Sequence, residues 1–267
     1  MHIDLQGRVA IVTGAGRGIG RDLVRRLAQE KVSTVALDVD TDALDELGKE
    51  LAATGVVSSQ FRCDVTDFER IQEVIGAVES QYGRIDILVN NAGIGATAPV
   101  ETLSEAAWRR CHDVNSTGTF LMCKAVIPVM KRQRSGRIIN AASFAVIVPT
   151  VAHAAYASSK AAVAHFTRAL AGELGPWGIT ANAYAPGMIP TMLNHFDERP
   201  AAEQAVLLDT LTLRRWGTTE DVANVVCFLA SDQAAYVTGT LIDVSGGKLA
   251  TQVPGVAYQL AAEEGLG

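Results

Sequence analysis

Three side chains that can exchange protons with an alcohol fall close together in the chain: Ser143, Tyr156 and Lys160. Tyr156 and Lys160 are four positions apart, so a helix would bring both side chains onto one face. A free tyrosine titrates near ~10, and a lysine cation a few ångströms away lowers that pKa by favouring the phenolate. Ser143 supplies a hydroxyl that can donate to, or accept from, the reacting oxygen. The trio is therefore suited to proton exchange with an alcohol or a carbonyl.

A glycine-rich stretch near the N-terminus is a second candidate site. The run Thr13-Gly-Ala-Gly-Arg-Gly-Ile-Gly20 joins an apolar segment to a helical pattern. Glycines let the backbone turn tightly and approach a pyrophosphate, whose charge then lies at a helix N-terminus. The spacing differs from the common Gly-x-Gly-x-x-Gly pattern, which has no match in the chain. We expect this loop to bind a dinucleotide.

Asp38 ends the second apolar run, twenty positions after Gly18, and bears on the choice of cofactor. A carboxylate there can accept hydrogen bonds from both ribose hydroxyls of NAD and repels a 2′-phosphate. Arg17 favours the other cofactor, because a guanidinium near this loop could pair with that phosphate. Val39 and Asp40, rather than a basic residue, follow Asp38. We therefore expect NAD and rank NADP second.

Short apolar runs alternate with amphipathic stretches along the whole chain. Strands without polar alternation are buried on both faces of a sheet. Regular strand–helix alternation implies right-handed crossovers and parallel strands. We expect an α/β fold: a doubly wound, mostly parallel sheet of about seven strands with helices on both faces, of Rossmann type. The predicted strands span residues 9–13, 34–38, 61–65, 87–90, 137–141, 179–184 and 241–244.

Capping signals predict where three helices begin. A serine or threonine followed three positions later by an acidic residue can form a capping box, which satisfies two backbone N–H groups at the helix start. Ser104, which lacks this acidic partner, is expected to cap a long helix that reaches about residue 130. The signals are Thr66 with Glu69, Ser104, and Thr218 with Asp221.

The chain carries no linker, repeat or low-complexity segment. We therefore expect one dinucleotide-binding and catalytic domain over residues 1–247. Residues 248–267 form a C-terminal tail, which is either loose, or packed on a neighbouring subunit or over a cleft.

The bulk composition excludes several kinds of protein. The chain has 267 residues, of which 48% are hydrophobic and 19% charged, so it is a folded domain. Its net charge of −6 argues against a nucleic acid or an anionic membrane as partner. The first residues have no signal-peptide character and the apolar stretch 138–159 is interrupted by polar residues, so we expect a cytoplasmic protein without a membrane span. Four cysteines without metal-binding spacing predict buried thiols and no metal site: Cys63, Cys111, Cys123 and Cys227.

Together these residues resemble the short-chain dehydrogenase/reductase family of the classical type. The resemblance covers nearly all of residues 5–247, and its motifs occur in the family's order. Beside the glycine loop, they are Asn90-Asn-Ala-Gly93, the set Asn115, Ser143, Tyr156 and Lys160, and Asn182-Ala-Tyr-Ala-Pro-Gly187 followed by Thr191.

The resemblance implies a role for each residue of the catalytic set. Tyr156 is the general acid/base. Lys160 lowers the pKa of Tyr156 and holds the nicotinamide ribose. Ser143 positions the substrate oxygen, and Asn115 anchors a water that relays the proton. Asn91, by contrast, is expected to tie the sheet together rather than touch a ligand. A homotetramer, built through the long helices around 105–130 and 155–174, is also implied.

The expected ligand contacts come from the glycine loop, from Asp38 and from the resemblance. Ile189 and Thr191 are implied to hold the carboxamide and phosphate region of the cofactor. The cofactor contacts are Gly14, Arg17, Gly18, Ile19, Gly20, Asp38, Asp64, Val65, Asn90, Ala92, Gly93, Tyr156, Lys160, Pro186, Gly187, Ile189 and Thr191. The substrate contacts are Ser143, Phe144, His153, Tyr156 and His195.

Two features depart from the family's pattern. Ser245 stands in the ending Asp243-Val-Ser-Gly-Gly247 where the family often has aspartate. The chain also continues beyond Gly247, where many relatives stop, so the role of the tail is open.

We expect an enzyme, an NAD-dependent oxidoreductase that transfers a hydride between a small-molecule secondary alcohol, polyol or sugar hydroxyl and the nicotinamide. The residues expected to line the substrate cleft are apolar and carry little fixed charge, which disfavours a large anion deep in the pocket. An NADPH-dependent 3-oxoacyl-type carbonyl reductase is the second interpretation. A non-catalytic NAD-binding sensor or scaffold is the third, since a fold does not determine a function.

Overall fold

The computed structural model describes residues 3–191, 194 and 196–264. Its centre is one sheet of seven strands in the order β3-β2-β1-β4-β5-β6-β7, and every neighbouring pair is parallel. The order reverses between β1 and β4, where ligands bind beyond the carboxyl ends of the strands in such sheets. The strands are β1 Val9–Thr13, β2 Ser33–Asp38, β3 Ser58–Arg62, β4 Ile87–Asn90, β5 Gly136–Ala141, β6 Ile179–Pro186 and β7 Leu241–Val244.

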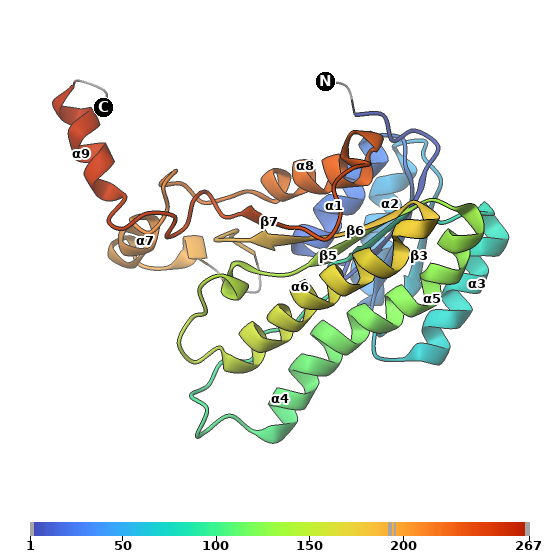
Figure 1. The fold of residues 1–267 in the computed structure, drawn as a ribbon, viewed down its shortest axis with the longest axis horizontal. Coiled ribbons are helices and arrows are strands. Elements are labelled where there is room, and N and C mark those ends of the chain that lie inside the picture. Colours follow the sequence, from blue (N-terminus) through green and yellow to red (C-terminus); the bar gives the residue numbers. More distant parts are fainter. Residues whose placement is uncertain (1–2, 192–193, 195, 265–267) are drawn as a thin grey trace.

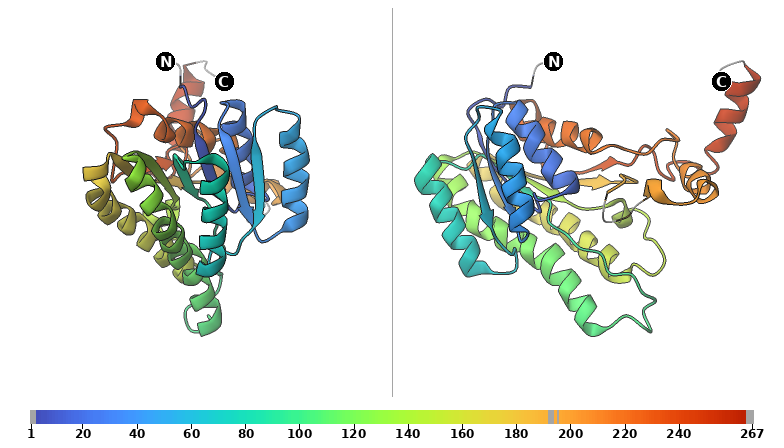
Figure 2. Two further views of the ribbon diagram at one scale, coloured as in Figure 1. Left: turned by 90° about the vertical axis from the view of Figure 1, so that its right-hand side faces the viewer. Right: turned by 180° about the vertical axis from the view of Figure 1, so that it is seen from behind.

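Helices cover both faces of the sheet, as the strand–helix alternation predicts (Figures 1 and 2). Each face has its own apolar core, because the central strands are buried on both sides. One core is covered by α1 Gly18–Gln29, α2 Thr41–Ala52 and α8 Thr219–Ala230. The other is covered by α3 Phe68–Tyr82, α5 Gly118–Gln133 and α6 Ala154–Leu174.

The third strand lies three residues before its predicted position. The prediction of residues 61–65 was wrong, since β3 ends at Arg62. The predicted capping box at Thr66 was also wrong. The Thr66 hydroxyl donates to Asp64 Oδ1 at 2.8 Å, and Asp67 instead caps α3 by accepting from the backbone N–H of Arg70. The acid two residues upstream thus competes successfully for the threonine side chain.

The long helix predicted after Ser104 is interrupted. Ser104 caps α4 (Glu105–His112) as expected, by accepting from the backbone N–H of Ala107. A π-helical turn, Asp113–Thr117, then separates α4 from α5. Such turns are rare and frequent at functional sites. This one contains Asn115, a residue of the predicted catalytic set.

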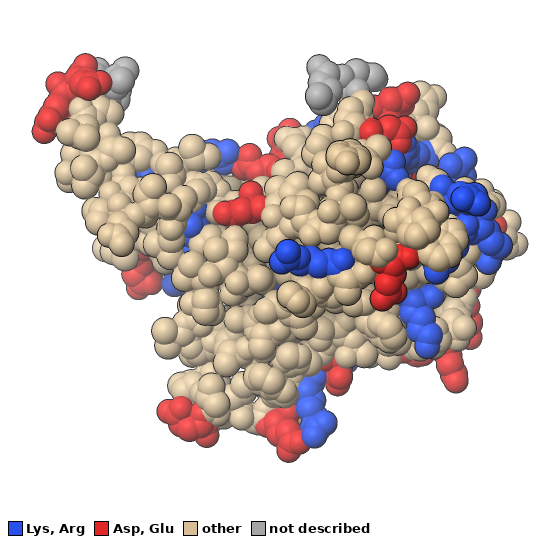
Figure 3. All heavy atoms as spheres, in the orientation of Figure 1, with Lys and Arg blue, Asp and Glu red and all other residues tan. Residues whose placement is uncertain are grey.

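The predicted capping box at the start of α8 is confirmed, since Thr218 and Asp221 accept from each other's backbone N–H. Beyond β6 lie the short helix α7 (Ala201–Leu208) and, at the chain's end, α9 (Gly255–Glu263). Helix α9 projects from one end of the molecule in Figure 1 and in the right-hand view of Figure 2, and Figure 3 shows acidic side chains at its outer end. None of the helices in the described ranges combines the length and the hydropathy of a membrane span.

Candidate active site

The glycine loop connects β1 to α1 through backbone positions that other residues rarely adopt. Gly14 and Gly18 have φ angles of +63° and +53°. A Cβ atom on Gly20 would lie 2.0 Å from the Gly14 carbonyl oxygen, so the helix packs against the loop without room for a side chain. These glycines therefore let the loop turn tightly and pack against the start of α1, and the approach of a pyrophosphate to the loop stays a prediction.

The N-terminus of α1 has no side-chain cap. Asp40, Asp67, Ser104 and Thr218 cap α2, α3, α4 and α8, whereas Arg17 at the start of α1 makes no such bond. The first turn of α1 also contains no acidic residue. Its backbone N–H groups and the positive end of its dipole are thus available to an anion, as a pyrophosphate requires.

Asn91 fastens the glycine loop to the centre of the sheet. Its backbone N–H and that of Ala92 both donate to the Thr13 hydroxyl at 3.0 Å. Its side-chain amide donates to the carbonyl oxygens of Thr13 and Gly14, and its Oδ1 accepts from the hydroxyl of buried Tyr184 at 3.1 Å. The expected tie is confirmed, and Asn91 also lines the cavity described below.

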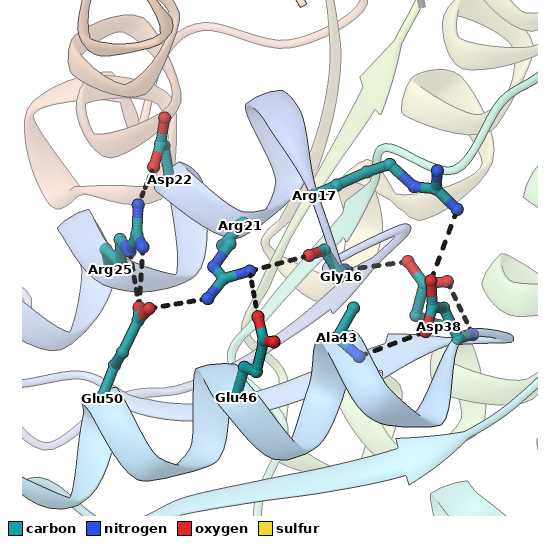
Figure 4. Close-up of polar contacts among 10 residues, drawn as sticks. Gly16, Arg17, Arg21, Asp22, Arg25, Asp38, Ala43, Glu46 and Glu50 are labelled. Atoms are coloured by element: carbon teal, nitrogen blue, oxygen red, sulfur yellow. Dashed lines mark hydrogen bonds and ion pairs between the residues drawn. The ribbon is translucent and has the colours of Figure 1, made fainter. Parts of the chain in front are cut away.

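Three backbone N–H groups hold the Asp38 carboxylate at the end of β2 (Figure 4). Oδ2 accepts from Gly16 at 2.8 Å, while Oδ1 accepts from Val39 at 2.7 Å and Asp40 at 3.0 Å. Asp38 therefore fixes the glycine loop against β2. One of about four lone-pair positions on the carboxylate remains for a ligand, and it lies on Oδ2.

Ser143 and Tyr156 come together at the carboxyl end of β5. Ser143 follows the strand, and its Oγ accepts from the backbone N–H of Ala145 at the start of a short 3₁₀ turn. Tyr156 lies in the first turn of α6. Burial raises the pKa of Tyr156 above its ordinary value, and the Ser143 hydroxyl lowers it by a smaller amount. The resting side chain is therefore a neutral phenol at pH 7.

Lys160 is on the same helix, four residues after Tyr156, and is buried. Its Nζ donates to the Ala141 carbonyl oxygen at 2.7 Å. Burial lowers the pKa of Lys160 to about 8. A Cβ atom at Gly93, in the loop after β4, would lie 3.2 Å from this Nζ. The absence of a side chain at this position therefore gives the Lys160 ammonium enough room. Burial is the largest influence on the Tyr156 pKa in this structure, and the lowering of that pKa by Lys160 stays a prediction.

Asn115 is fully buried and bonded on both ends of its amide. Oδ1 accepts from the backbone N–H of Ile94 at 2.8 Å, and Nδ2 donates to the Ile94 carbonyl oxygen and to the Ser159 hydroxyl. The Thr119 hydroxyl donates to the Asn115 carbonyl oxygen. The residue thus holds the loop after β4 against α6, and its part in a proton relay stays a prediction.

A cavity of about 460 Å³ runs along these elements, from the glycine loop to Tyr156 and Lys160. Its lining includes residues at the carboxyl ends of β1, β2, β4, β5 and β6. Ligands of such sheets bind at this edge, where the strand order reverses between β1 and β4. The predicted residues that line it are Gly14, Arg17, Gly18, Ile19, Asp38, Asp64, Val65, Ala92, Gly93, Tyr156, Lys160, Pro186 and Thr191.

Other predicted contacts do not line this cavity. Asn90 is the clearest correction, because its side chain is buried and donates to Asn140 Oδ1 inside the sheet. His153 bonds to Thr97 and to the Val151 carbonyl oxygen near the loop after β4. His195 lies outside the described residues. The others that do not line it are Gly20, Asn115, Ser143, Phe144, Gly187 and Ile189.

Sequence reasoning missed eight residues of the lining, whereas Ile94 was expected as a wall of the substrate site and does line the cavity. Arg110 reaches Asp64 Oδ2 at 3.4 Å from α4, a contact that the unbroken helix of the prediction did not indicate. Tyr184 stands inside the motif 182–187, but its hydroxyl role depends on Asn91 and has no signal in the sequence. The missed residues are Val39, Cys63, Asn91, Arg110, Val114, Ala141, Ala142 and Tyr184.

Known proteins share both the sequence and the fold. Residues 14–248 match the family model described as Enoyl-(Acyl carrier protein) reductase. The 3-oxoacyl-[acyl-carrier-protein] reductase FabG of Thermotoga maritima is 39% identical over 91% of this chain and 98% of its own. The cyclohexanol dehydrogenase of Rhodococcus sp. is 39% identical over 92% of this chain and 97% of its own.

Among solved structures, NAD⁺-bound xylitol dehydrogenase superposes with a TM-score of 0.87 at 32% identity, over 91% of this chain and 99% of its own. These matches agree with the order of the strands in the sheet and with the helices on both of its faces. An NAD(P) cofactor and a substrate with a CH–OH group or the matching carbonyl follow from the kinship. The chain is a member of the short-chain dehydrogenase/reductase family and an oxidoreductase.

Proposed function

We propose that the chain is an NAD-dependent dehydrogenase of secondary alcohols, polyols or sugar hydroxyls. The observation that carries the choice of cofactor is the Asp38 carboxylate, held in the cavity lining by three backbone N–H groups. A 2′-phosphate beside it would bring like charges together, whereas a ribose hydroxyl can donate to it.

The chain's residues fit a dinucleotide. The uncapped start of α1 suits a pyrophosphate, and the cavity extends from there to Tyr156 and Lys160. Gly93 leaves room for the Lys160 ammonium, which faces the cavity and can bond to a ribose hydroxyl. When bound, the nicotinamide supplies the hydride acceptor or donor.

The proton chemistry belongs to Tyr156. In alcohol oxidation its phenolate takes the hydroxyl proton, and in carbonyl reduction the neutral phenol donates one. The Ser143 hydroxyl lowers the pKa of Tyr156, and we expect it to hold the substrate oxygen beside the tyrosine. The raised pKa of the resting tyrosine suits the acid role. Oxidation then needs the positive charge of Lys160 near the phenolate.

The names of the relatives support alcohols as the substrate class without selecting one. Cyclohexanol dehydrogenase and xylitol dehydrogenase, by their names, act on a cyclic alcohol and a polyol. In this chain, His153 and Thr97, bonded to each other, offer polar atoms near the loop after β4.

We also propose a homotetramer in the cytoplasm. The outer face of α6 carries four small exposed residues, Ala161, Ala162, Ala169 and Gly172, beside the exposed polar residues His165, Arg168 and Glu173. The small residues let a second helix approach closely. Trp108 and Phe120 are exposed on the neighbouring helices α4 and α5. The four cysteines are buried free thiols, in keeping with a reducing compartment.

A 3-oxoacyl reductase that uses NADPH is the second candidate. Arg17 lines the cavity and favours it, as does the 39% identity to a FabG protein. The test is NADH or NADPH appearance with the purified chain and a panel of secondary alcohols, polyols, sugars and hydroxysteroids. Turnover with NAD supports the proposed function. Turnover with NADP alone contradicts it and supports the reductase.

A further inference from the structure

Asp40 makes two contacts immediately after the cavity-lining residues Asp38 and Val39. Its Oδ1 accepts from the backbone N–H of Ala43 at 3.1 Å and so caps α2. Its Oδ2 lies 3.6 Å from Nη2 of Arg17. Figure 4 shows the Arg17 side chain extending from the glycine loop toward the segment that carries Asp38 and Ala43. Asp40 thus joins the loop to the start of α2.

Arg21, one helical turn further along α1, is neutralised in the same way. Its Nη2 donates to Glu50 at 2.6 Å, and its Nη1 lies 3.5 Å from Glu46, both on α2 (Figure 4). The side chain is only 18% exposed. Both arginines beside the glycine loop are therefore paired with carboxylates of the segment that follows β2.

The acidic start of α2 removes a second anion site. A helix N-terminus stabilises a phosphate through its free N–H groups and its dipole. Here the Asp40 carboxylate already occupies the N–H of Ala43, and Asp42 adds another negative charge in the first turn. A phosphate at this place would meet the Asp40 carboxylate in addition to that of Asp38.

We propose that Asp40 is a specificity-determining residue for the cofactor, because it holds Arg17 in an ion pair and withholds that guanidinium from the 2′-phosphate of NADP. The inference rests on the proposed function in one respect: the adenosine ribose lies at Asp38. The proposed function assigns the discrimination between NAD and NADP to Asp38 alone. The present inference assigns part of it to the ion pair of Arg17 and Asp40.

The exposure of the pair bears on its role. The side chains are 58% and 40% exposed, and such pairs contribute little to folding stability. An arginine that binds a phosphate makes stronger, often bidentate bonds. The pair therefore matters more for what Arg17 can bind than for the fold, and removing the charge of Asp40 should leave the chain folded.

The test compares the affinity of the full chain for NADP⁺ and for NAD⁺, measured by isothermal titration calorimetry. Asp40→Asn removes the charge and keeps the cap, because asparagine and aspartate cap helices equally well. The NADP⁺ affinity of this variant should rise by about fivefold relative to NAD⁺. Asp42→Asn is the matched control, since it removes the same charge from the same helical turn. In this control, the ratio of the NADP⁺ affinity to the NAD⁺ affinity should change by less than about twofold from wild type.

Arg17→Gln decides whether the gain depends on the arginine. In a chain that already carries Arg17→Gln, Asp40→Asn should raise the NADP⁺ affinity relative to NAD⁺ by less than half as much as it does in wild type. An equal gain in both backgrounds, an equal gain from Asp42→Asn, or no gain from Asp40→Asn would each overturn the proposal. A wild-type chain that binds NADP⁺ more tightly than NAD⁺ would contradict the proposed function instead, and the arginine dependence of the Asp40 effect would still decide the role of the pair.

Discussion

The ammonium of Lys160 donates a 2.7 Å hydrogen bond to the carbonyl oxygen of Ala141, the last residue of β5. The bond joins the catalytic helix α6 to the edge of the sheet where the cavity lies. It also keeps a positive charge in a buried place, where a lysine loses part of its solvation. The resulting low pKa, about 8, connects the site to the stability of the fold.

Lys160→Met should therefore change how stability depends on pH. The unfolded chain binds this proton up to about pH 10.5, whereas the folded chain releases it near 8. Lys160 thus costs stability below pH 8, and the cost disappears as the pH rises from 8 to 10.5. Urea unfolding should show wild type gaining up to about 3 kcal/mol over Lys160→Met across this window. A difference independent of pH would contradict the buried ammonium.

Tyr156 should remain a neutral phenol in the cofactor-free protein at pH 8. Burial raises its pKa above the ordinary value of 10.0, so the phenolate appears only in more alkaline solution. The difference in tyrosinate absorbance between wild type and Tyr156→Phe, followed by pH titration, measures this directly. A tyrosinate signal unique to wild type at pH 8 would show that another charge outweighs burial in the resting site.

Gly20→Ala should abolish dinucleotide binding or folding of the loop, since its Cβ would lie 2.0 Å from the Gly14 carbonyl oxygen. Gly76→Ala in α3 is the matched control, because nothing lies within 4 Å of its Cβ. The control should stabilise the chain by about 0.5–1 kcal/mol through helix propensity. Thermal unfolding and NAD titration of both variants check this. Normal NAD binding by Gly20→Ala would mean that the loop can adapt.

The sequence predicted the architecture well, because buried parallel strands and capping residues leave local signals. Asp38, Ser104 and Thr218 are where their signals placed them. The errors arose where two local signals competed or where a contact is distant. The Thr66 hydroxyl donates to Asp64 rather than forming the predicted capping box. The π-helical turn contains Asn115, which is bonded to Ile94 in the loop after β4, a contact that is distant in the sequence.

The site residues also fall into those with a local signal in the sequence and those whose contacts are distant in the chain. The backbone motifs of the glycine loop and the spacing of Tyr156 and Lys160 are local, so the sequence was sufficient to place them in one cavity. The partners of Lys160 and of Tyr184 are 19 and 93 positions away. Contacts at that separation depend on the sheet order, which the pattern of apolar runs does not specify.

Removal of residues 252–267, most of the predicted tail 248–267, tests the division into domain and tail. Lys248 forms a β-bridge with Leu211, and the Leu249 N–H donates to the Thr210 carbonyl oxygen. In the removed segment, the Tyr258 hydroxyl donates to the Thr212 carbonyl oxygen at 2.7 Å, and its ring lies under Arg214. The free energy of unfolding should fall by no more than about 2 kcal/mol. Urea unfolding at one protein concentration checks this. A truncated chain that fails to fold would place the tail within the domain.

Replacement of Tyr156 by phenylalanine tests the central claim most directly. The variant lacks only the phenolic oxygen, while the glycine loop and Asp38 are untouched. With an alcohol that the wild type oxidises, NADH formation should fall by at least about 10²-fold, while the dissociation constant for NAD⁺ in the same preparation changes by less than about threefold. Retention of most of the turnover would contradict the assignment of Tyr156 as the acid/base.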